Sequence, residues 1–303
     1  EGYGDWDPLE ELLGRAHAAG LQVYAWVEVL PIWAGMEPPP PSEPEHMYNL
    51  FSARFSEEWL QGNEAGPLRG AEGMFYASPL HSQVRDYLAA LCRDIVSRYE
   101  VDGLHLTGLA YAGGDAGTDP ASRQSYAAYL EGGGDREYED WRRLQLTELL
   151  RRLQGEVLSV RPACRLSVGV WPLYGDEWDW EELEAYSDLG QDVQAWVEGG
   201  YVDLVMPELQ VAPQLPEPER QAAALEGYLP HVRGRLLVPV LPGEVASFAE
   251  LNRAIVSARA AGVDGVVISD FRALEERGYW DDLASGPFAR KASVPPALWR
   301  WRG

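Results

Sequence analysis

Four carboxylates follow apolar, strand-like stretches of the sequence, at positions where a side chain can take part in chemistry. They are Glu28, Glu208, Glu244 and Asp270. Two carboxyl groups that face one cleft can work as a pair, in which one donates a proton to a leaving oxygen and the other attacks carbon or activates water. Cleavage of a glycosidic bond uses such a pair, and a separation of about 5–5.5 Å favours retention whereas about 6.5–9.5 Å favours inversion.

Glu208 is the first candidate for the proton donor. It follows a buried run that ends in Met206-Pro207, which predicts the partly apolar setting that a general acid requires. A bond to an arginine or a backbone amide explains a carboxylate at this position nearly as well. Glu28 is expected on a neighbouring part of the rim and is a candidate partner, although it can equally be an edge residue that faces solvent.

The other two carboxylates have structural explanations of their own. Glu244 follows a Pro-Gly turn and is a second candidate partner of Glu208, but a carboxylate held by the dipole at a helix N-terminus explains it almost as well. Asp270 ends the last predicted strand. It is a candidate substrate ligand, or it caps the helix that begins near Arg272.

Aromatic residues are unusually frequent, with twelve tryptophans in the chain. Flat indole faces suit the C–H faces of sugar rings, although packing in the core explains any single tryptophan about as well. Trp26 and Trp171 are the best candidate stacking platforms. Six tryptophans lie in or near predicted strand ends and the loops beyond them, namely Trp26, Trp33, Trp171, Trp178, Trp180 and Trp196.

Three further polar side chains are candidate substrate ligands. Tyr24 and Thr107 can form hydrogen bonds with a hydroxyl group. His105 alternates with two leucines on a strand, so it should point to the opposite side from them. It is either a core histidine with satisfied hydrogen bonds or a ligand of a hydroxyl group. Asp102, at the start of the same strand, is expected to be structural and to bind backbone amides.

Helical and strand-like segments alternate along the chain. A long irregular excursion over 31–73, with four consecutive prolines at 38–41, is typical of a lid or a rim insertion. Strands are predicted over 21–29, 101–111, 164–172, 202–210, 235–242 and 264–271. Helices are predicted from Asp7-Pro8 to Gly20, from His81 to Tyr99, from about Arg123 to Val160 with a break at Gly132–Gly134, up to Gly199-Gly200, over 217–230 and over 247–261.

Six strands, apolar on both faces and separated by helices, predict a parallel sheet covered by helices. Because no strand is followed by G-x-G-x-x-G, an α/β parallel (β/α)8-type barrel is favoured over a doubly wound sheet. A closed barrel of this type needs eight strands, so six strands leave a sheet with two unpaired edges. We therefore expect two strands and a helix that belong before Glu1, on a removed upstream segment or on another chain. The barrel domain is predicted over 1–286, followed by a C-terminal tail over 287–303.

Composition excludes several classes of function. A net charge of −23 argues against a nucleic-acid partner, and no run of eighteen apolar residues is present to span a membrane. Cys92 and Cys164 are expected to be buried free thiols. No P-loop, H-E-x-x-H motif or Cys/His cluster occurs, so neither a cofactor nor a metal is expected. A barrel aldolase or phosphate-binding enzyme is a weaker alternative, because no lysine stands at a strand end.

Three stretches together resemble the bacterial glycosyl-hydrolase-like barrel family, glycosyl-hydrolase-like family 10. They are DPLEELLGRAHAAGLQVYAWVEV, VDGLHLTGLAY and YVDLVMPELQ, and their order and spacing match from about residue 5 to about residue 275. In the family these motifs belong to the third, fourth and sixth strands, which agrees with two strands before residue 1. The resemblance implies an extracytoplasmic or secreted barrel that acts on a glycan, in some members the glycan strands of the bacterial cell wall.

The chain departs from the family pattern at its strand ends. Thr107 stands where the family has an aspartate, and Tyr24 where it usually has histidine. Glu28 and Glu208 stand where the family has asparagine and glutamine. Two hypotheses follow. The chain is a glycoside hydrolase with a rearranged carboxylate pair, or it is a catalytically inactive barrel that keeps a carbohydrate-binding cleft.

Overall fold

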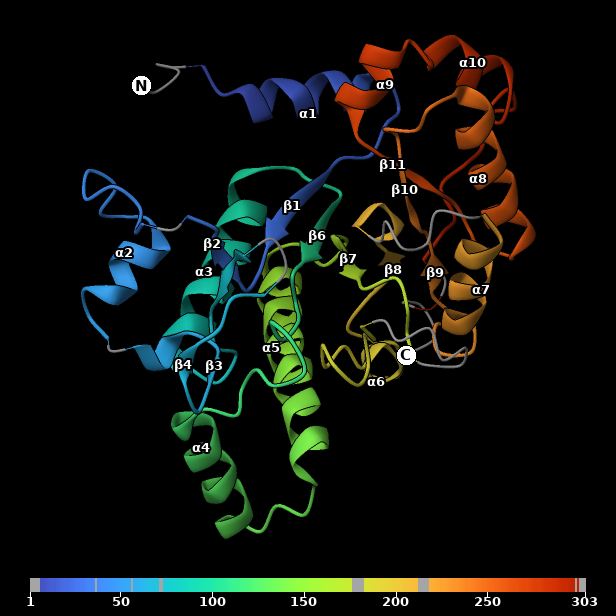
Figure 1. The fold of residues 1–303 in the computed structure, drawn as a ribbon. Coiled ribbons are helices and arrows are strands. Elements are labelled where there is room, and N and C mark those ends of the chain that lie inside the picture. The colour runs from blue at the N-terminus through green and yellow to red at the C-terminus, as the bar shows by residue number, and fades with distance from the viewer. Residues whose placement is uncertain are drawn as a thin grey trace. The chain divides into compact units, whose positions relative to one another are not determined.

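The structure is a computed structural model, drawn in Figure 1, that describes residues 6–35, 37–55, 57–70, 73–175, 183–211, 218–297 and 299. Contacts within the chain divide it into two compact units. Unit 1 contains Glu1–Ser167 and Ser187–Asp192, and unit 2 contains Val168–Tyr186 and Val193–Gly303.

The predicted α/β fold with a parallel sheet is confirmed. Five strands form one sheet in the order β1-β6-β7-β8-β9, and β10 pairs in parallel with β11. Each successive pair of these strands is separated in the sequence by one or more helices, except β9 and β10. The strand bounds are Tyr24–Glu28 for β1, Gly103–Thr107 for β6, Arg165–Val170 for β7, Leu204–Pro207 for β8, Leu236–Leu237 for β9, Val240–Pro242 for β10 and Val267–Ser269 for β11.

The strand predicted over 235–242 is interrupted, because Val238 and Pro239 separate β9 from β10. Proline has no N–H group to donate to a neighbouring strand. Pairing nevertheless continues across the break, since Val238 N donates to Val205 O and a parallel bridge joins Glu208 to Val240. The six predicted strands therefore all exist, in the predicted order.

Unit 1 begins with a helix whose start the sequence predicts well. The carboxylate of Asp7 accepts hydrogen bonds from the amides of Leu9 and Glu10, and Pro8 occupies the first turn. The predicted break at the triple glycine is also confirmed, and α3 packs along α5 (Figure 1). The helices of this unit are α1 (Pro8–Ala18), α2 (Met47–Ser52), α3 (Ser82–Arg98), α4 (Pro120–Glu131) and α5 (Tyr138–Val160).

The excursion after β1 has secondary structure of its own within unit 1. Besides α2 it contains a 3-10 turn, η1 (Glu57–Trp59), and two short antiparallel pairs, β2 with β5 and β3 with β4. The bounds are Pro31–Trp33 for β2, Gly62–Asn63 for β3, Gly66–Pro67 for β4 and Phe75–Tyr76 for β5. It is thus a folded insertion that follows the carboxyl end of β1.

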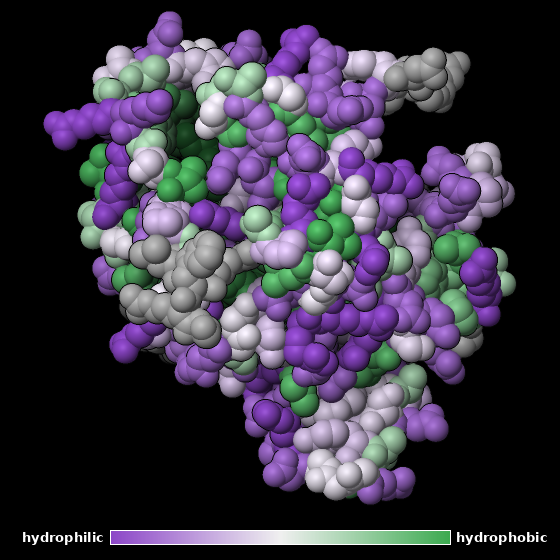
Figure 2. Space-filling view, turned by 180° about the vertical axis from the view of Figure 1, so that it is seen from behind, coloured by the Kyte–Doolittle hydropathy of each residue, from purple (hydrophilic) through white to green (hydrophobic). Residues whose placement is uncertain are grey.

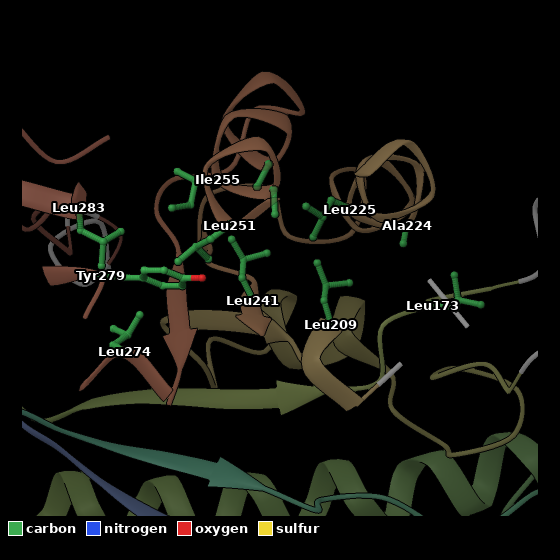
Figure 3. Close-up of a cluster of buried hydrophobic side chains, with 12 residues drawn as sticks. Leu173, Leu209, Ala224, Leu225, Leu241, Leu251, Ile255, Leu274, Tyr279 and Leu283 are labelled. Atoms are coloured by element: carbon green, nitrogen blue, oxygen red, sulfur yellow. The ribbon is translucent and has the colours of Figure 1, made fainter. Parts of the chain in front are cut away.

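Unit 2 contains an apolar cluster to which η3 and the helices α7 to α10 contribute side chains. Figure 3 shows Leu209, Leu225, Leu241 and Ile255 pointing into this cluster. Helix α7 packs against α8, and α8 against β10. Helical segments of this unit are α6 (Val193–Glu198), η3 (Leu209–Val211), α7 (Pro218–Tyr228), α8 (Phe248–Ala260), α9 (Phe271–Arg277) and α10 (Trp280–Ser285).

Both cysteines are buried free thiols, as predicted, and burial raises the pKa of the Cys92 thiol to about 12. The face in Figure 2 is mostly hydrophilic, with hydrophobic residues in small patches. Within the described part of the chain, no helix is both long and apolar enough to cross a membrane. In the tail, the Trp299 indole N–H donates to Asp203 Oδ1 at 2.7 Å and the ring lies under Arg235, both residues of unit 2.

Candidate functional site

In unit 1, one face of the β1–β6 pair carries most of the predicted substrate ligands. Trp26 lies opposite His105 in the register, and Glu28 lies opposite Thr107. Side chains alternate between the two faces of a strand, and opposed residues of paired strands share a face. Trp26, Glu28, His105 and Thr107 therefore line one face, whereas the two leucines of β6 are fully buried on the other.

Trp26 combines exposure with a fixed orientation. Its side chain is 68% exposed, yet its indole N–H donates a hydrogen bond of 2.5 Å to the hydroxyl of Thr107, which is 5% exposed. The bond links β1 to β6 and restrains the ring, whose faces remain open to solvent. An exposed, oriented indole is the arrangement that stacking on a sugar ring needs.

His105 and Tyr24 lie nearer the amino ends of the same two strands. The His105 Nδ1 atom lies 2.9 Å from the hydroxyl of Ser167, a fully buried residue on β7. Burial lowers the pKa of His105 to about 4, so its imidazole is neutral at neutral pH. The Tyr24 ring lies directly over Gly103, where any Cβ would meet ring atoms at 2.3 Å. Glycine is therefore required beneath this tyrosine.

Glu28 is exposed at the carboxyl end of β1. The described residues offer its carboxylate neither a hydrogen bond nor an ion pair. Its position agrees with both interpretations drawn from the sequence, a reactive group at the rim and an edge residue that faces solvent. At the start of β6, the Asp102 carboxylate accepts a bond of 2.7 Å from the Val23 amide and pairs with His17, so the predicted structural role of Asp102 is confirmed.

In unit 2, Glu208 stands where β8 ends and η3 begins. Its backbone N–H donates to Val170 O at 2.9 Å, and the residue is half-buried. Tyr228 is fully buried nearby and donates a hydrogen bond to the carbonyl of Trp171. The pKa of Tyr228 is raised well above its usual value, mainly by burial and to a smaller extent by the charges of Tyr174 and Glu208. Glu208 is thus a half-buried carboxylate whose charge acts on a buried phenol, and its role as a proton donor stays a prediction.

The structure confirms the capping role of Asp270 and removes one alternative for Glu244. Asp270 Oδ1 accepts a bond of 2.8 Å from Ala273 N, so it caps α9 as one interpretation expected. Glu244 is exposed, and α8 is capped by Ser247 three residues later. The alternative of a carboxylate in the first turn of that helix is therefore wrong for Glu244.

The tryptophans predicted near strand ends differ in how deeply they are buried. Trp171 is half-buried at the end of β7, and Trp33 is half-buried with its indole N–H bound to the Glu37 carbonyl. Trp196 is fully buried in α6, so packing in the core, the alternative given for any single tryptophan, is confirmed for this residue. Trp178 and Trp180 lie outside the described residues.

Sequence reasoning missed Gln61, which ties the excursion to the loop that follows β6. Gln61 is 1% exposed, and its amide group donates to the carbonyls of Ala77 and Ala110 at 3.1 and 3.2 Å. Its side-chain oxygen accepts a bond of 2.8 Å from Ala112 N. The only sequence feature that pointed to a buried Gln61 was its position directly after the apolar pair Trp59-Leu60. The excursion is thus held in place where β1 and β6 end.

A cavity of about 340 Å³ also lies in unit 1, between the β3–β4 hairpin and the start of α4. Acidic residues on its wall are Glu57, Glu58, Glu64 and Asp119. Among the described residues, no cluster of three or more histidine, cysteine, aspartate or glutamate side chains is arranged to hold a metal ion.

Comparison with known proteins shows which family the chain belongs to. Residues 1–224 match the family described as Glycosyl hydrolase-like 10. The chain belongs to the glycosyl hydrolase-like 10 family. This finding confirms the resemblance carried by the three sequence stretches.

Curated relatives of this glycosyl hydrolase-like 10 chain are distant in sequence. Glycosyl hydrolase DigH of Escherichia coli K12 is 26% identical over 217 residues, which cover 67% of this chain and 46% of the relative. Glycosyl hydrolase YngK of Bacillus subtilis is 22% identical over 213 residues, which cover 67% of this chain and 39% of the relative. The matched part of the chain thus spans less than half of each relative.

Solved structures show the same fold. The glycoside hydrolase domain of PgaB (BpsB) from Bordetella bronchiseptica has a TM-score of 0.62 and 15% identity, and the match covers 93% of this chain and 79% of that domain. Alpha-L-fucosidase isoenzyme 2 from Paenibacillus thiaminolyticus has a TM-score of 0.57 and 14% identity, over 94% and 40% of the two chains. The glycosyl hydrolase-like 10 chain thus has the fold of glycoside-hydrolase barrels.

Proposed function

We propose that this chain binds a bacterial polysaccharide, a cell-wall or secreted glycan, at the carboxyl ends of its strands and hydrolyses its O-glycosidic bonds. Membership of a glycoside-hydrolase-like family supports a carbohydrate-processing role. The observation that carries the proposal is the indole of Trp26, exposed but held by Thr107, on the same face as Glu28. Carbohydrate in such polymers lies outside the cytoplasm, so we propose an extracytoplasmic or secreted location.

In this proposal Glu208 donates a proton to the leaving oxygen. The half-buried position at the carboxyl end of β8 supports that role, because a general acid must project toward the substrate from a site that is partly shielded from water. Glu244, the exposed carboxylate of the same unit, is its proposed partner, and attacks the anomeric carbon or activates water. Tyr24, Trp171 and Asp270 complete the proposed set of substrate ligands, Asp270 through the carboxylate oxygen that does not cap α9.

A second candidate is a barrel that binds glycan without cleaving it. Thr107 cannot act as a carboxylic acid, and its hydroxyl is engaged by the Trp26 indole. The residue at the family's aspartate position therefore orients a binding platform instead of serving acid–base chemistry. This observation favours binding alone as the alternative.

One experiment separates the two candidates. Purified cell-wall glycan and secreted polysaccharide are incubated with the wild type, Glu208→Gln and Glu226→Gln, and released reducing ends are measured. Glu226 is an exposed carboxylate on α7 and serves as the matched control. If Glu208 is the acid, Glu208→Gln should lose about 100-fold or more of the rate, while Glu226→Gln keeps it.

Binding is measured on the same polymers with Trp26→Ala as a further variant. Loss of the indole should weaken binding by about two- to tenfold, the usual value of an aromatic contact beyond its buried area. Wild-type protein that binds but releases no ends would support binding alone. Wild-type protein that neither binds nor cleaves any polymer in the panel would contradict both candidates.

A further inference from the structure

The Ser167 hydroxyl lies within hydrogen-bond distance of two groups, the His105 ring nitrogen Nδ1 and the Leu104 carbonyl. The Ser167 hydroxyl has one proton, and its oxygen lies 3.3 Å from the Leu104 carbonyl in donor geometry. When that proton goes to the carbonyl, the same oxygen can only accept from its other neighbour, His105 Nδ1, at 2.9 Å. Nδ1 then carries the imidazole proton and Nε2 keeps a lone pair.

The Nε2 atom is free to meet a ligand. No described residue forms a hydrogen bond with it, and His105 remains partly open to solvent on the face that also holds Trp26. A neutral imidazole with an unprotonated Nε2 is an uncharged acceptor, which suits a hydroxyl donor and not an anionic group.

We infer that His105 Nε2 accepts a hydrogen bond from a sugar hydroxyl next to the ring that stacks on Trp26, and that Ser167 is the positioning residue that fixes the acceptor tautomer. The inference rests on the proposed glycan-binding function. It adds a specificity determinant to that function, because a sugar whose hydroxyl at this position is methylated or absent cannot donate the bond.

Nitrogen-15 NMR of protein labelled in its histidine rings tests the tautomer without any ligand. The chain has five histidines, so single His→Asn variants assign the His105 signals. We expect a protonated Nδ1 and an unprotonated Nε2 in the wild type, and a mixture of tautomers in Ser167→Ala. An unprotonated Nδ1 in the wild type would overturn the inference, whatever the protein binds.

Soluble fragments of cell-wall glycan then test the acceptor. Adding them should shift the Nε2 resonance, and His105→Asn and Ser167→Ala should each weaken binding by about two- to tenfold, the value of one hydrogen bond. Ser167→Thr keeps a hydroxyl and should restore both the tautomer and the affinity relative to Ser167→Ala. Wild-type binding with no change at Nε2 and no loss in His105→Asn refutes the inference but leaves the proposed function intact. Failure of the wild type to bind, with the tautomer as predicted, counts against the proposed function instead.

Discussion

At the scale of single residues, Thr107 has the most informative role. The threonine stands where the resemblance to the family places an aspartate, and this replacement taken alone indicates the loss of an acid–base group. The structure shows what the hydroxyl does instead, because it accepts the indole N–H of an otherwise exposed tryptophan. This contact joins residues 81 positions apart in the chain, so it depends on the register between β1 and β6 and had no local signal in the sequence.

Removing only the Thr107 hydroxyl should loosen the Trp26 platform. Thr107→Val keeps the side-chain shape but cannot accept the indole hydrogen bond, whereas Thr107→Ser can. We expect the valine variant to bind cell-wall glycan fragments about two- to tenfold more weakly than the serine variant, measured by isothermal titration calorimetry. Equal affinities for the two variants would show that this bond does not orient a binding surface.

His105 should make stability depend on pH. Its pKa is about 4 in the folded protein and about 6.5 in the unfolded chain, so between these values the unfolded state binds more protons. The free energy of unfolding should therefore fall as pH decreases from about 6.5 to about 4, by up to about 3 kcal/mol from this residue. Urea unfolding across this pH range should show a smaller fall for His105→Asn. The same fall in both proteins would contradict the burial of a neutral imidazole.

At the scale of elements, the sequence predicts helices and strands well where local signals agree. Asp7 with Pro8 marks the start of α1, and the triple glycine separates α4 from α5. The interruption at Pro239 was visible as a proline in an apolar run, but the continued pairing around it depends on neighbouring strands. For Trp196 the sequence left core packing and a stacking platform open, because its burial depends on tertiary packing, which no local pattern reports.

Gln61 should hold the excursion against the loop after β6. Gln61→Leu removes three hydrogen bonds and leaves buried backbone groups without partners, which should lower the free energy of unfolding by about 2 kcal/mol or more. Hydrogen exchange at the Ala112 amide should accelerate as well. The exposed Gln22 provides the control, since Gln22→Leu should change neither quantity.

Asp270 offers a test of capping against binding. Asparagine can replace aspartate as a cap, so Asp270→Ala should lose about 1 kcal/mol of stability while Asp270→Asn loses little. Thermal unfolding measures this difference. A drop in glycan affinity in Asp270→Asn, with stability unchanged, would be the signature of its proposed second role as a sugar ligand.

At the scale of the whole molecule, fold and family follow from strand order and from three sequence stretches. The parallel order of strands and the TM-score of 0.62 to a glycoside hydrolase domain agree with the barrel type predicted from alternating elements. The candidate site was predicted only as residue types at strand ends. Which of them are exposed, cap a helix or form hydrogen bonds is decided by packing, as Asp270 and His105 show.

A crystal structure of the protein soaked with soluble cell-wall glycan fragments tests the central claim most directly. We predict a sugar ring stacked on the exposed indole of Trp26, with a hydroxyl group directed to His105 Nε2 and the chain of sugars extending along the carboxyl ends of β1 and β6. Glycan bound on another surface, with the Trp26 indole uncovered, would contradict the account.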